Sequence, residues 1–98
     1  MSINYTCVTL GAAQNLTTGA ASARIASPLG NGTIIVRLMA TTDCYIKIGD
    51  STVVADTTTS TYVAALIPEY IQVRPGQFIA AIQVALAGLL NITECSGG

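Results

Sequence analysis

The chain contains very little charge. Of its 98 residues, 9% are Asp, Glu, Lys or Arg, there is no histidine and no tryptophan, and 51% are hydrophobic. A soluble globular domain ordinarily carries charge on about a quarter of its residues. The surface must therefore consist largely of Ala, Ser, Thr and apolar side chains, a composition typical of surfaces that an assembly covers. These features favour an architectural protein over an enzyme.

The residue types that are missing also limit the chemistry. Histidine, the usual general acid or base at neutral pH, is absent. The acidic residues Asp43, Asp50 and Asp56 fall at expected strand ends and in a turn, where aspartate is common without any catalytic role. Their spacing does not match that of a calcium-binding loop. We therefore expect no catalytic residue, no metal ion and no cofactor.

Cysteine is scarce, and its spacing excludes the usual metal sites. Cys7, Cys44 and Cys95 are an odd number, no two of them form a C-x-x-C pair, and no histidine could complete a zinc site. We expect buried, reduced thiols that pack as small hydrophobic side chains. A disulfide between Cys7 and Cys95, joining the two terminal strands, is the alternative.

Neither charge nor hydropathy indicates nucleic acid or membrane as a partner. The net charge is −1 and the charges are scattered, so there is no basic run. The longest apolar stretch, residues 78–90, is interrupted by Gln83 and is too short to cross a bilayer. Residues 1–5 lack the basic start and apolar core of a signal peptide. We therefore expect a protein that is assembled in a cytoplasm.

Apolar residues recur at every second position in most of the chain, which predicts β-structure. Tight-turn signals separate the segments, among them Gly49-Asp50 and Pro75-Gly76. Strands are expected at residues 4–10, 20–26, 34–39, 44–48, 51–55, 62–67, 70–74, 78–86 and 89–94. The chain should be all-β, a single small β-sandwich of about eight short antiparallel strands.

The length fits one domain. Residues 20–98 are expected to form the β-sandwich, with an edge strand at its start, and residues 1–19 an N-terminal strand and arm. Within that arm, residues 11–19 are rich in Ala and Thr and give weak signals for either helix or strand. We predict that they form a loop or an arm.

Residues 78–86 contain Ala and Leu, which also favour helix. Their large side chains instead fall at alternate positions: Phe78, Ile82, Val84 and Leu86. Ala80 is the one interruption. A helix would need large residues at intervals of three and four, so the segment is predicted to be a strand.

Four outward-facing residues are the candidates for a binding site. They are two tyrosines and two basic residues at alternate strand positions: Tyr45, Lys47, Tyr70 and Arg74. Aromatic rings with basic neighbours could stack a sugar or a single-stranded nucleic acid. The same residues are typical of cross-strand pairing on a half-exposed sheet or at a subunit interface. We favour the interface.

Every asparagine in the chain lies two residues before a threonine: Asn4, Asn15, Asn31 and Asn91. In an exported protein these triplets would accept N-linked sugars. Without a signal peptide they would not meet that machinery, and a structural cause is the remaining explanation.

Three stretches of sequence resemble a known family. They are residues 43–50 (DCYIKIGD), residues 68–76 (PEYIQVRPG), and the ending formed by residues 79–83 (IAAIQ) and 90–94 (LNITE). Together they resemble the small β-sandwich structural proteins of tailed bacteriophages, including capsid cement (decoration) proteins. The resemblance covers the chain from Thr33 onward and rests on pattern, since no catalytic motif is involved.

The resemblance implies a jelly-roll-like protein, often a trimer, on the outer surface of a virion capsid. There it would bind the major capsid protein, bridge neighbouring capsomers and stabilise the shell, with residues 2–19 as an arm that reaches a neighbour. Similar patterns occur in other virion parts. A receptor- or glycan-binding module of a tail or head fibre, and a head–tail connector component, are the alternatives.

Overall fold

The structure, a computed structural model, describes residues 9–30 and 35–96. These residues contain no helix, and so none long and apolar enough to cross a membrane. The all-β prediction is confirmed by eight strands: β1 (Thr9–Thr18), β2 (Ala23–Arg24), β3 (Ile35–Ala40), β4 (Cys44–Gly49), β5 (Thr61–Val63), β6 (Glu69–Gln72), β7 (Phe78–Gln83) and β8 (Gly88–Ser96).

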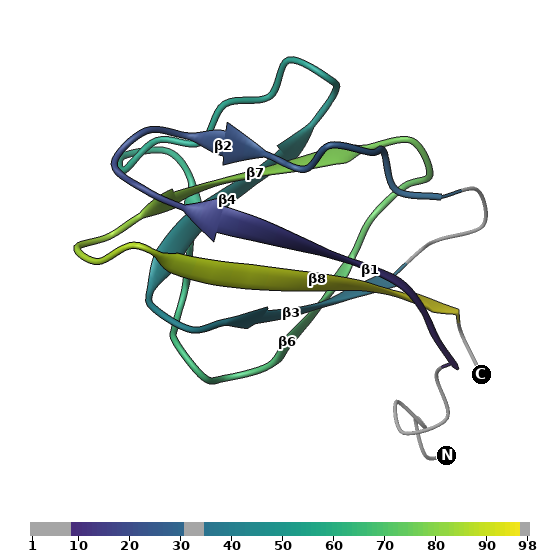
Figure 1. The fold of residues 1–98 in the computed structure, drawn as a ribbon. Helices are drawn as coiled ribbons and strands as arrows, with labels where there is room; N and C mark the ends of the chain where they lie inside the picture. The colour runs from purple at the N-terminus through teal and green to yellow at the C-terminus, as the bar shows by residue number, and fades with distance from the viewer. Residues whose placement is uncertain (1–8, 31–34, 97–98) are drawn as a thin grey trace.

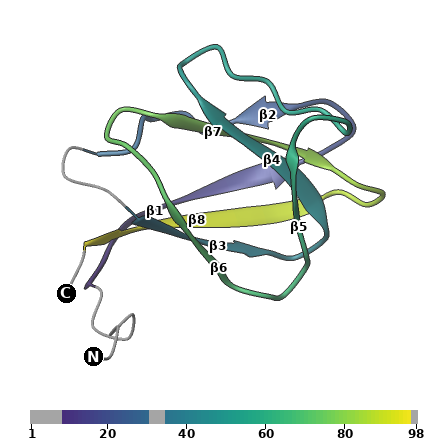
Figure 2. The same cartoon turned by 180° about the vertical axis from the view of Figure 1, so that it is seen from behind.

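The strands form two antiparallel sheets packed face to face (Figure 1). The first sheet has the order β1-β8-β3-β6 and the second the order β2-β7-β4-β5. Strands pair as 1 with 8, 2 with 7, 3 with 6 and 4 with 5, as in one long hairpin that has been rolled up. This arrangement is a jelly roll, a double-sheet form of the β-sandwich. In Figure 1 the edge strands β1 and β2 face the viewer. Figure 2 shows the molecule from behind, where the other two edge strands, β5 and β6, lie in front.

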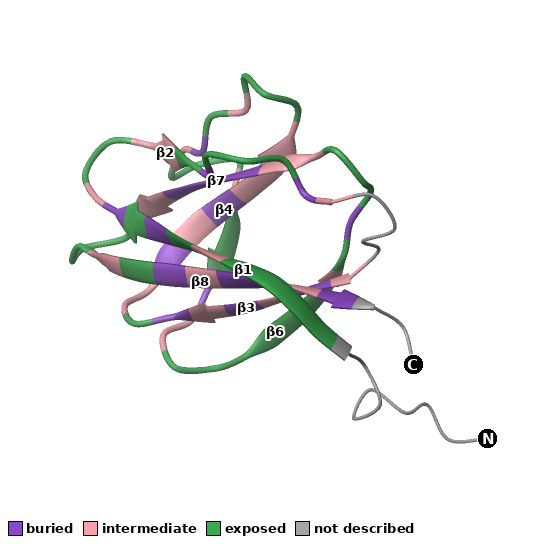
Figure 3. Cartoon of the chain, turned by 45° about the vertical axis from the view of Figure 1, so that its right-hand side comes forward, coloured by how far each residue is buried: buried purple, intermediate pink, exposed green. Residues whose placement is uncertain are grey.

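The core lies between the sheets and follows the predicted alternation on β3, whereas on β7 the three consecutive residues 79–81 are buried. On β3, Val36 and Leu38 are fully buried, whereas Arg37 and Met39 are only partly buried. Buried residues accordingly alternate with more exposed ones along this strand (Figure 3). Both sheets contribute to one hydrophobic cluster: Leu16, Ile25, Leu29, Val36, Leu38, Ala40, Cys44, Ile46, Val63, Val73, Ile79, Ala81, Leu90 and Ile92.

The prediction of a loop or arm for residues 11–19 is wrong for most of that segment. Residues 9–18 form β1, which pairs along its length with β8, with one register shift between Leu10 and Ala13. The predicted strand at residues 4–10 lies outside the described residues, except for its last two, which begin β1. The predicted edge strand at residues 20–26 is reduced to the two residues of β2.

Residues 51–55 do not form the predicted return strand. The Asp50 carboxylate accepts hydrogen bonds from the backbone N–H (2.8 Å) and the hydroxyl (2.6 Å) of Thr52. An aspartate that bonds two residues onward closes a turn instead of extending a strand. The chain then continues as a long loop, and the strand that returns beside β4 is β5.

This loop folds over the outer face of the second sheet. Arg24 on β2 donates from Nη1 to the Val53 carbonyl (3.0 Å), and the Ala55 N–H donates to the Ser22 hydroxyl (2.9 Å). Ala80 on β7 faces outward between Arg24 and a residue of β4, yet it is completely buried. Ala80 is the small residue that interrupts the alternation of large side chains in residues 78–86, and its short side chain leaves room for the loop.

Candidate interaction surface

Tyr45 and Lys47 lie on the outward face of β4, as predicted, and both are half-buried. The Tyr45 ring meets that of Tyr62 edge to face, with 5.6 Å between the ring centroids. Lys47 Nζ donates to the Thr59 hydroxyl (3.0 Å) and lies 3.9 Å from an Asp56 carboxylate oxygen. The pKa of Asp56 is held well below its usual value, chiefly by hydrogen bonds from Thr59. Both predicted residues therefore already have partners within the chain.

Tyr70 and Arg74 belong to a different part of the molecule. Tyr70 lies on β6 in the first sheet, is exposed, and is the cross-strand neighbour of Arg37 on β3. Arg74 is exposed in the turn after β6, where its N–H donates to the Gln77 side chain (2.8 Å). The structure thus places the four predicted residues as one pair on β4 and another on and after β6, in separate sheets.

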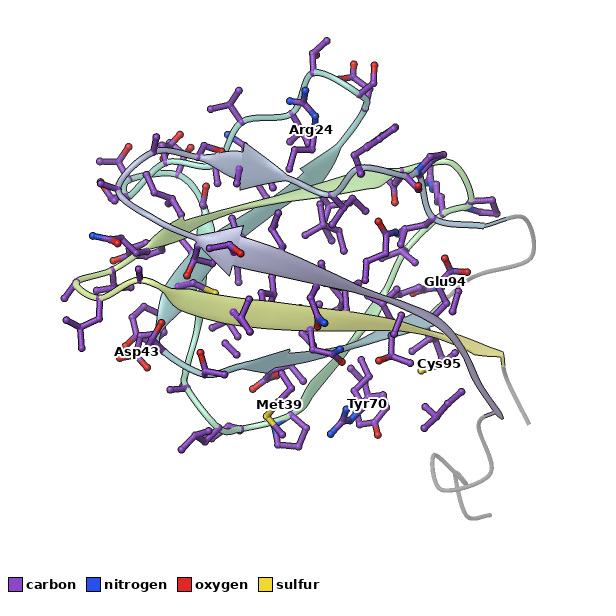
Figure 4. The ribbon with its side chains drawn as sticks, viewed as in Figure 1. Arg24, Met39, Asp43, Tyr70, Glu94 and Cys95 are labelled. Atoms are coloured by element: carbon purple, nitrogen blue, oxygen red, sulfur yellow. The ribbon has the colours of Figure 1, made fainter. Side chains whose placement is uncertain are left out.

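A second surface, which the sequence did not single out, lies at one end of the sandwich. It consists of large apolar residues of the β5–β6 connection, the β7–β8 turn and the start of β8. Hydrogen bonds place these segments next to the β3–β4 turn, where Asp43 is labelled (Figures 1 and 4). We call this surface the apolar end, and its residues are Leu66, Ile67, Val84, Leu86 and Leu89. The two most exposed are Leu66 (73%) and Leu86 (68%). Exposed apolar groups that gather in this way commonly mark an interaction site.

Hydrogen bonds join the segments of the apolar end to the β3–β4 turn. They run from Leu66 N to the Ala40 carbonyl (2.8 Å), from Thr42 Oγ1 to the Leu86 carbonyl (3.1 Å) and from Val84 N to the Asp43 carbonyl (3.3 Å). A hollow of about 300 Å³ lies between Ala65 on one side and residues 84–86 on the other. The surface is therefore held in place before any partner arrives, which reduces the entropy lost on binding.

Asp43 is the only charged residue among residues 41–43, 64–68 and 84–89. One of its carboxylate oxygens accepts the Tyr62 hydroxyl, and the other accepts the Ala65 N–H (2.7 Å). These two bonds hold the pKa of Asp43 below its usual value, with the tyrosine contributing most, and the same bond raises the pKa of Tyr62. The carboxylate is therefore ionised but engaged within the chain, and it is the one charged group in these three segments.

Leu66 has a backbone conformation that leucine rarely adopts. Its φ angle is +63°, the one positive φ at a non-glycine residue in residues 9–30 and 35–96. For an L-residue this left-handed conformation costs about 1–2 kcal/mol. Strain of this kind tends to persist where function requires it. Here it keeps a leucine side chain in solvent at the tip of the molecule.

Sequence patterns missed the apolar end because its residues were predicted to continue strands. The strands expected at residues 62–67 and 78–86 stop at Val63 and Gln83. After Val63, the bond from the Ala65 N–H to the β3–β4 turn leads the chain away from β4. The available signal was a loss of alternation, because both segments end in runs of consecutive apolar or small residues.

The asparagine triplets have a structural explanation on β1 and β8. Asn15 and Asn91 are cross-strand partners, and the Asn91 amide donates to the Asn15 side-chain oxygen (2.9 Å). The Thr93 hydroxyl donates to the Asn91 side-chain oxygen (2.9 Å). Because residues two apart share a face of a strand, the spacing places these polar groups in one chain of hydrogen bonds. The triplets at Asn4 and Asn31 begin outside the described residues.

The alkylation rate of Cys44 tests whether this thiol is reactive. Cys44 is completely buried on β4, and burial, with a smaller contribution from Asp43, raises its pKa from 9.0 to about 11. Since the thiolate is the nucleophile, we expect alkylation of Cys44 at pH 8 to be about a hundredfold slower than that of a thiol with the ordinary pKa. Mass spectrometry of peptides from the alkylated native protein measures this rate, and the urea-unfolded protein is the control. Rapid labelling of native Cys44 would contradict the assignment of an inert thiol.

Across residues 9–30 and 35–96, no three His, Cys, Asp or Glu side chains are grouped so that they could hold a metal ion. The geometry is that of a two-sheet jelly roll with an exposed, apolar end. Compared with protein-family models, curated proteins and solved structures, the chain matches none of them.

Proposed function

We propose that this chain is a structural protein of a bacteriophage virion, of the capsid cement (decoration) type. It binds the major capsid protein, bridges neighbouring capsomers and thereby stabilises the shell. The observation that carries the proposal is the apolar end, an exposed and preorganised apolar surface in a chain with 9% charged residues. Such a surface suits a dry protein–protein contact.

The energy available at the apolar end fits a contact that is repeated many times. Fully burying a leucine side chain contributes about 1.5–3 kcal/mol. Leu66 and Leu86 are each about two-thirds or more exposed, so together they offer about 2–4 kcal/mol per site before the cost of association. One such contact is weak. Many copies on one shell, each bridging two capsomers, make it effective through multivalency.

The fold and the sequence resemblance support the same proposal. Jelly rolls are frequent among viral capsid and lectin domains. The fold alone does not assign a function, so this support is analogy. The resemblance of residues 43–50 and 68–76 to phage structural proteins rests on their pattern of strands and turns, so it supports the proposal together with the fold and not apart from it.

A fibre module that binds a receptor or glycan is the second candidate. The observation that favours it is the exposed Tyr70 beside Arg37 on the outer face of the first sheet. An aromatic ring next to a guanidinium is a common element of sugar-binding surfaces, and it would use a different face from the apolar end. Tyr70→Ala therefore separates the two candidates.

The double variant Leu66→Lys/Leu86→Lys is expected to abolish binding to capsid shells that lack this protein. Charged side chains at both positions would have to be desolvated in the contact. Co-sedimentation with purified shells measures the binding, and circular dichroism verifies the fold. Val54→Lys is the matched control, because Val54 is also an exposed apolar residue (58%) but lies in the loop over the second sheet. Two results would argue against the apolar end as the site: the double variant still binds shells, or the single variant Tyr70→Ala loses binding to shells.

A further inference from the structure

The two sheets have four edge strands, and one differs from the rest in length. The edges are β1 and β6 in the first sheet, and β2 and β5 in the second. Three of these strands have two to four residues, whereas β1 has ten. An edge strand exposes unpaired backbone groups, and a long one can accept a further strand.

The same strand lacks charge and proline, and its one irregularity, between Leu10 and Ala13, leaves the register of residues 13–18 regular. Charged side chains, prolines and very short strands discourage pairing with another chain. β6 begins at Glu69 and lies between Pro68 and Pro75, and β2 carries Arg24. Residues 9–18 contain no charged residue and no proline. β1 is the unprotected edge of this molecule.

The geometry of β1 is suitable for pairing. From Ala13 to Thr18 its register with β8 is regular, and its side chains at Ala13, Asn15 and Thr17 are exposed. Every second residue of an edge strand directs its N–H and C=O away from the neighbouring strand. Within residues 9–30 and 35–96, β8 is the only strand that pairs with β1. The Gln14 side chain exchanges hydrogen bonds with the Ser27 backbone (3.0 and 3.3 Å), but no backbone group of the described residues outside β8 is paired with the outward row of β1 as a strand.

We propose that β1 pairs with β1 of a second copy, antiparallel and about a two-fold axis. The pair would join two four-stranded sheets into one continuous sheet. A second copy is the occupant because β1 can pair with itself: its exposed side chains between Ala13 and Thr18 are small and uncharged, so two copies meet without repulsion, and among the described strands it is the one long edge without charge or proline. The two-fold contact closes on itself and leaves no long edge exposed, which avoids open-ended fibres.

The inference does not depend on the proposed function, since it uses the side of the sandwich and not its apolar end. It also differs from the trimer that the sequence resemblance implies. A pair of chains, each with a free apolar end, could bridge two capsomers. The two proposals are measured separately, by solution mass and by binding to shells.

Light scattering across a dilution series is the first experiment. The protein is expected to show twice the monomer mass of 10.0 kDa and to dissociate on dilution. In Ala13→Lys/Thr17→Lys, like charges meet across the axis, and we expect dimerisation at least about tenfold weaker. The control Ser51→Lys/Gln72→Lys adds the same charge at exposed positions away from β1 and should remain dimeric. A monomeric or trimeric wild-type protein, or a dimer that the β1 variant leaves intact, would overturn the proposal.

Hydrogen exchange on the unmodified protein provides a second measurement that needs no variant. At high concentration, alternate amides between Ala13 and Thr18 should exchange slowly, and dilution below the dimer range should speed their exchange. Amides of β6 should not respond to concentration, because that edge stays free. Exchange in β1 that is independent of concentration would contradict the pairing, and concentration-dependent protection at β6 would assign the contact to the other edge.

Discussion

Gly88→Ala is expected to lower the free energy of unfolding by about 2–4 kcal/mol, because overpacking costs about 1–3 kcal/mol and each lost hydrogen bond about 0.5–1.5 kcal/mol. Gly88 begins β8 beside the β3–β4 turn. A Cβ atom there would lie 2.6 Å from Thr41 Oγ1 and closer still to Thr42 Oγ1. The glycine is needed for space, since its φ angle is not positive.

The two threonine hydroxyls cannot simply rotate away from the added methyl group. Thr41 Oγ1 accepts the Leu89 N–H (2.9 Å), and Thr42 Oγ1 donates to the Leu86 carbonyl (3.1 Å). Both bonds fix apolar-end residues, so the substitution should also weaken binding to shells. Denaturant unfolding measures the first effect and co-sedimentation the second.

Gly19→Ala is the control for this substitution. A Cβ atom on Gly19 would meet nothing within 4 Å, so its stability should change by no more than about 1 kcal/mol, and in the stabilising direction. Equal destabilisation by the two alanines would mean that the loss of a glycine, and not crowding at the β3–β4 turn, is responsible.

The parts of the fold that local chemistry determines could be predicted from the sequence. On β4, Cys44 and Ile46 are buried and Tyr45 and Lys47 point outward, as the alternation predicts. The turn at Pro75-Gly76 forms with a glycine φ of +83°. In both cases neighbouring residues alone decide the conformation.

Non-local contacts decided what the sequence patterns missed. β1 is rich in Ala and Thr, and its strand conformation depends on pairing with β8, whose partner residues lie seventy or more positions away. The apolar end depends on the side chains of Asp43 and Thr42, which bond to residues 65 and 86. The sequence pattern within residues 62–67 or 78–86 does not indicate where those partners lie. The outward direction of Tyr45, Lys47, Tyr70 and Arg74 could be predicted, whereas their division between two sheets could not.

Leu66→Gly is expected to change stability and assembly in opposite directions. Glycine adopts a φ of +63° without strain, which recovers about 1–2 kcal/mol, while its greater freedom in the unfolded chain costs about 0.5–1 kcal/mol. The isolated chain should therefore become more stable by about 0.5–1 kcal/mol. Binding to shells should weaken at least about tenfold, because most of an exposed leucine no longer enters the contact.

Leu66→Ala separates the two effects. Alanine removes the same apolar contact but keeps a Cβ atom in the left-handed conformation, so it should weaken binding as glycine does without the gain in stability. Thermal unfolding of the isolated variants and co-sedimentation with shells provide both measurements. If the glycine variant is less stable than the alanine variant by about 0.5–1 kcal/mol, the entropic cost of glycine alone, the backbone at this position carries no strain.

The stability and binding measurements together test why residue 66 is a leucine. A residue that costs stability in the isolated chain and is 73% exposed contributes nothing to the core. The Leu66 N–H bond to the Ala40 carbonyl supports this conformation in the isolated chain, and under the proposed function the contact made by the covered side chain in the particle would offset the strain further. If the glycine variant is more stable and binds shells with unchanged affinity, the leucine has no role in the contact with the shell. The Tyr70 face would then be the next candidate for the shell-binding site.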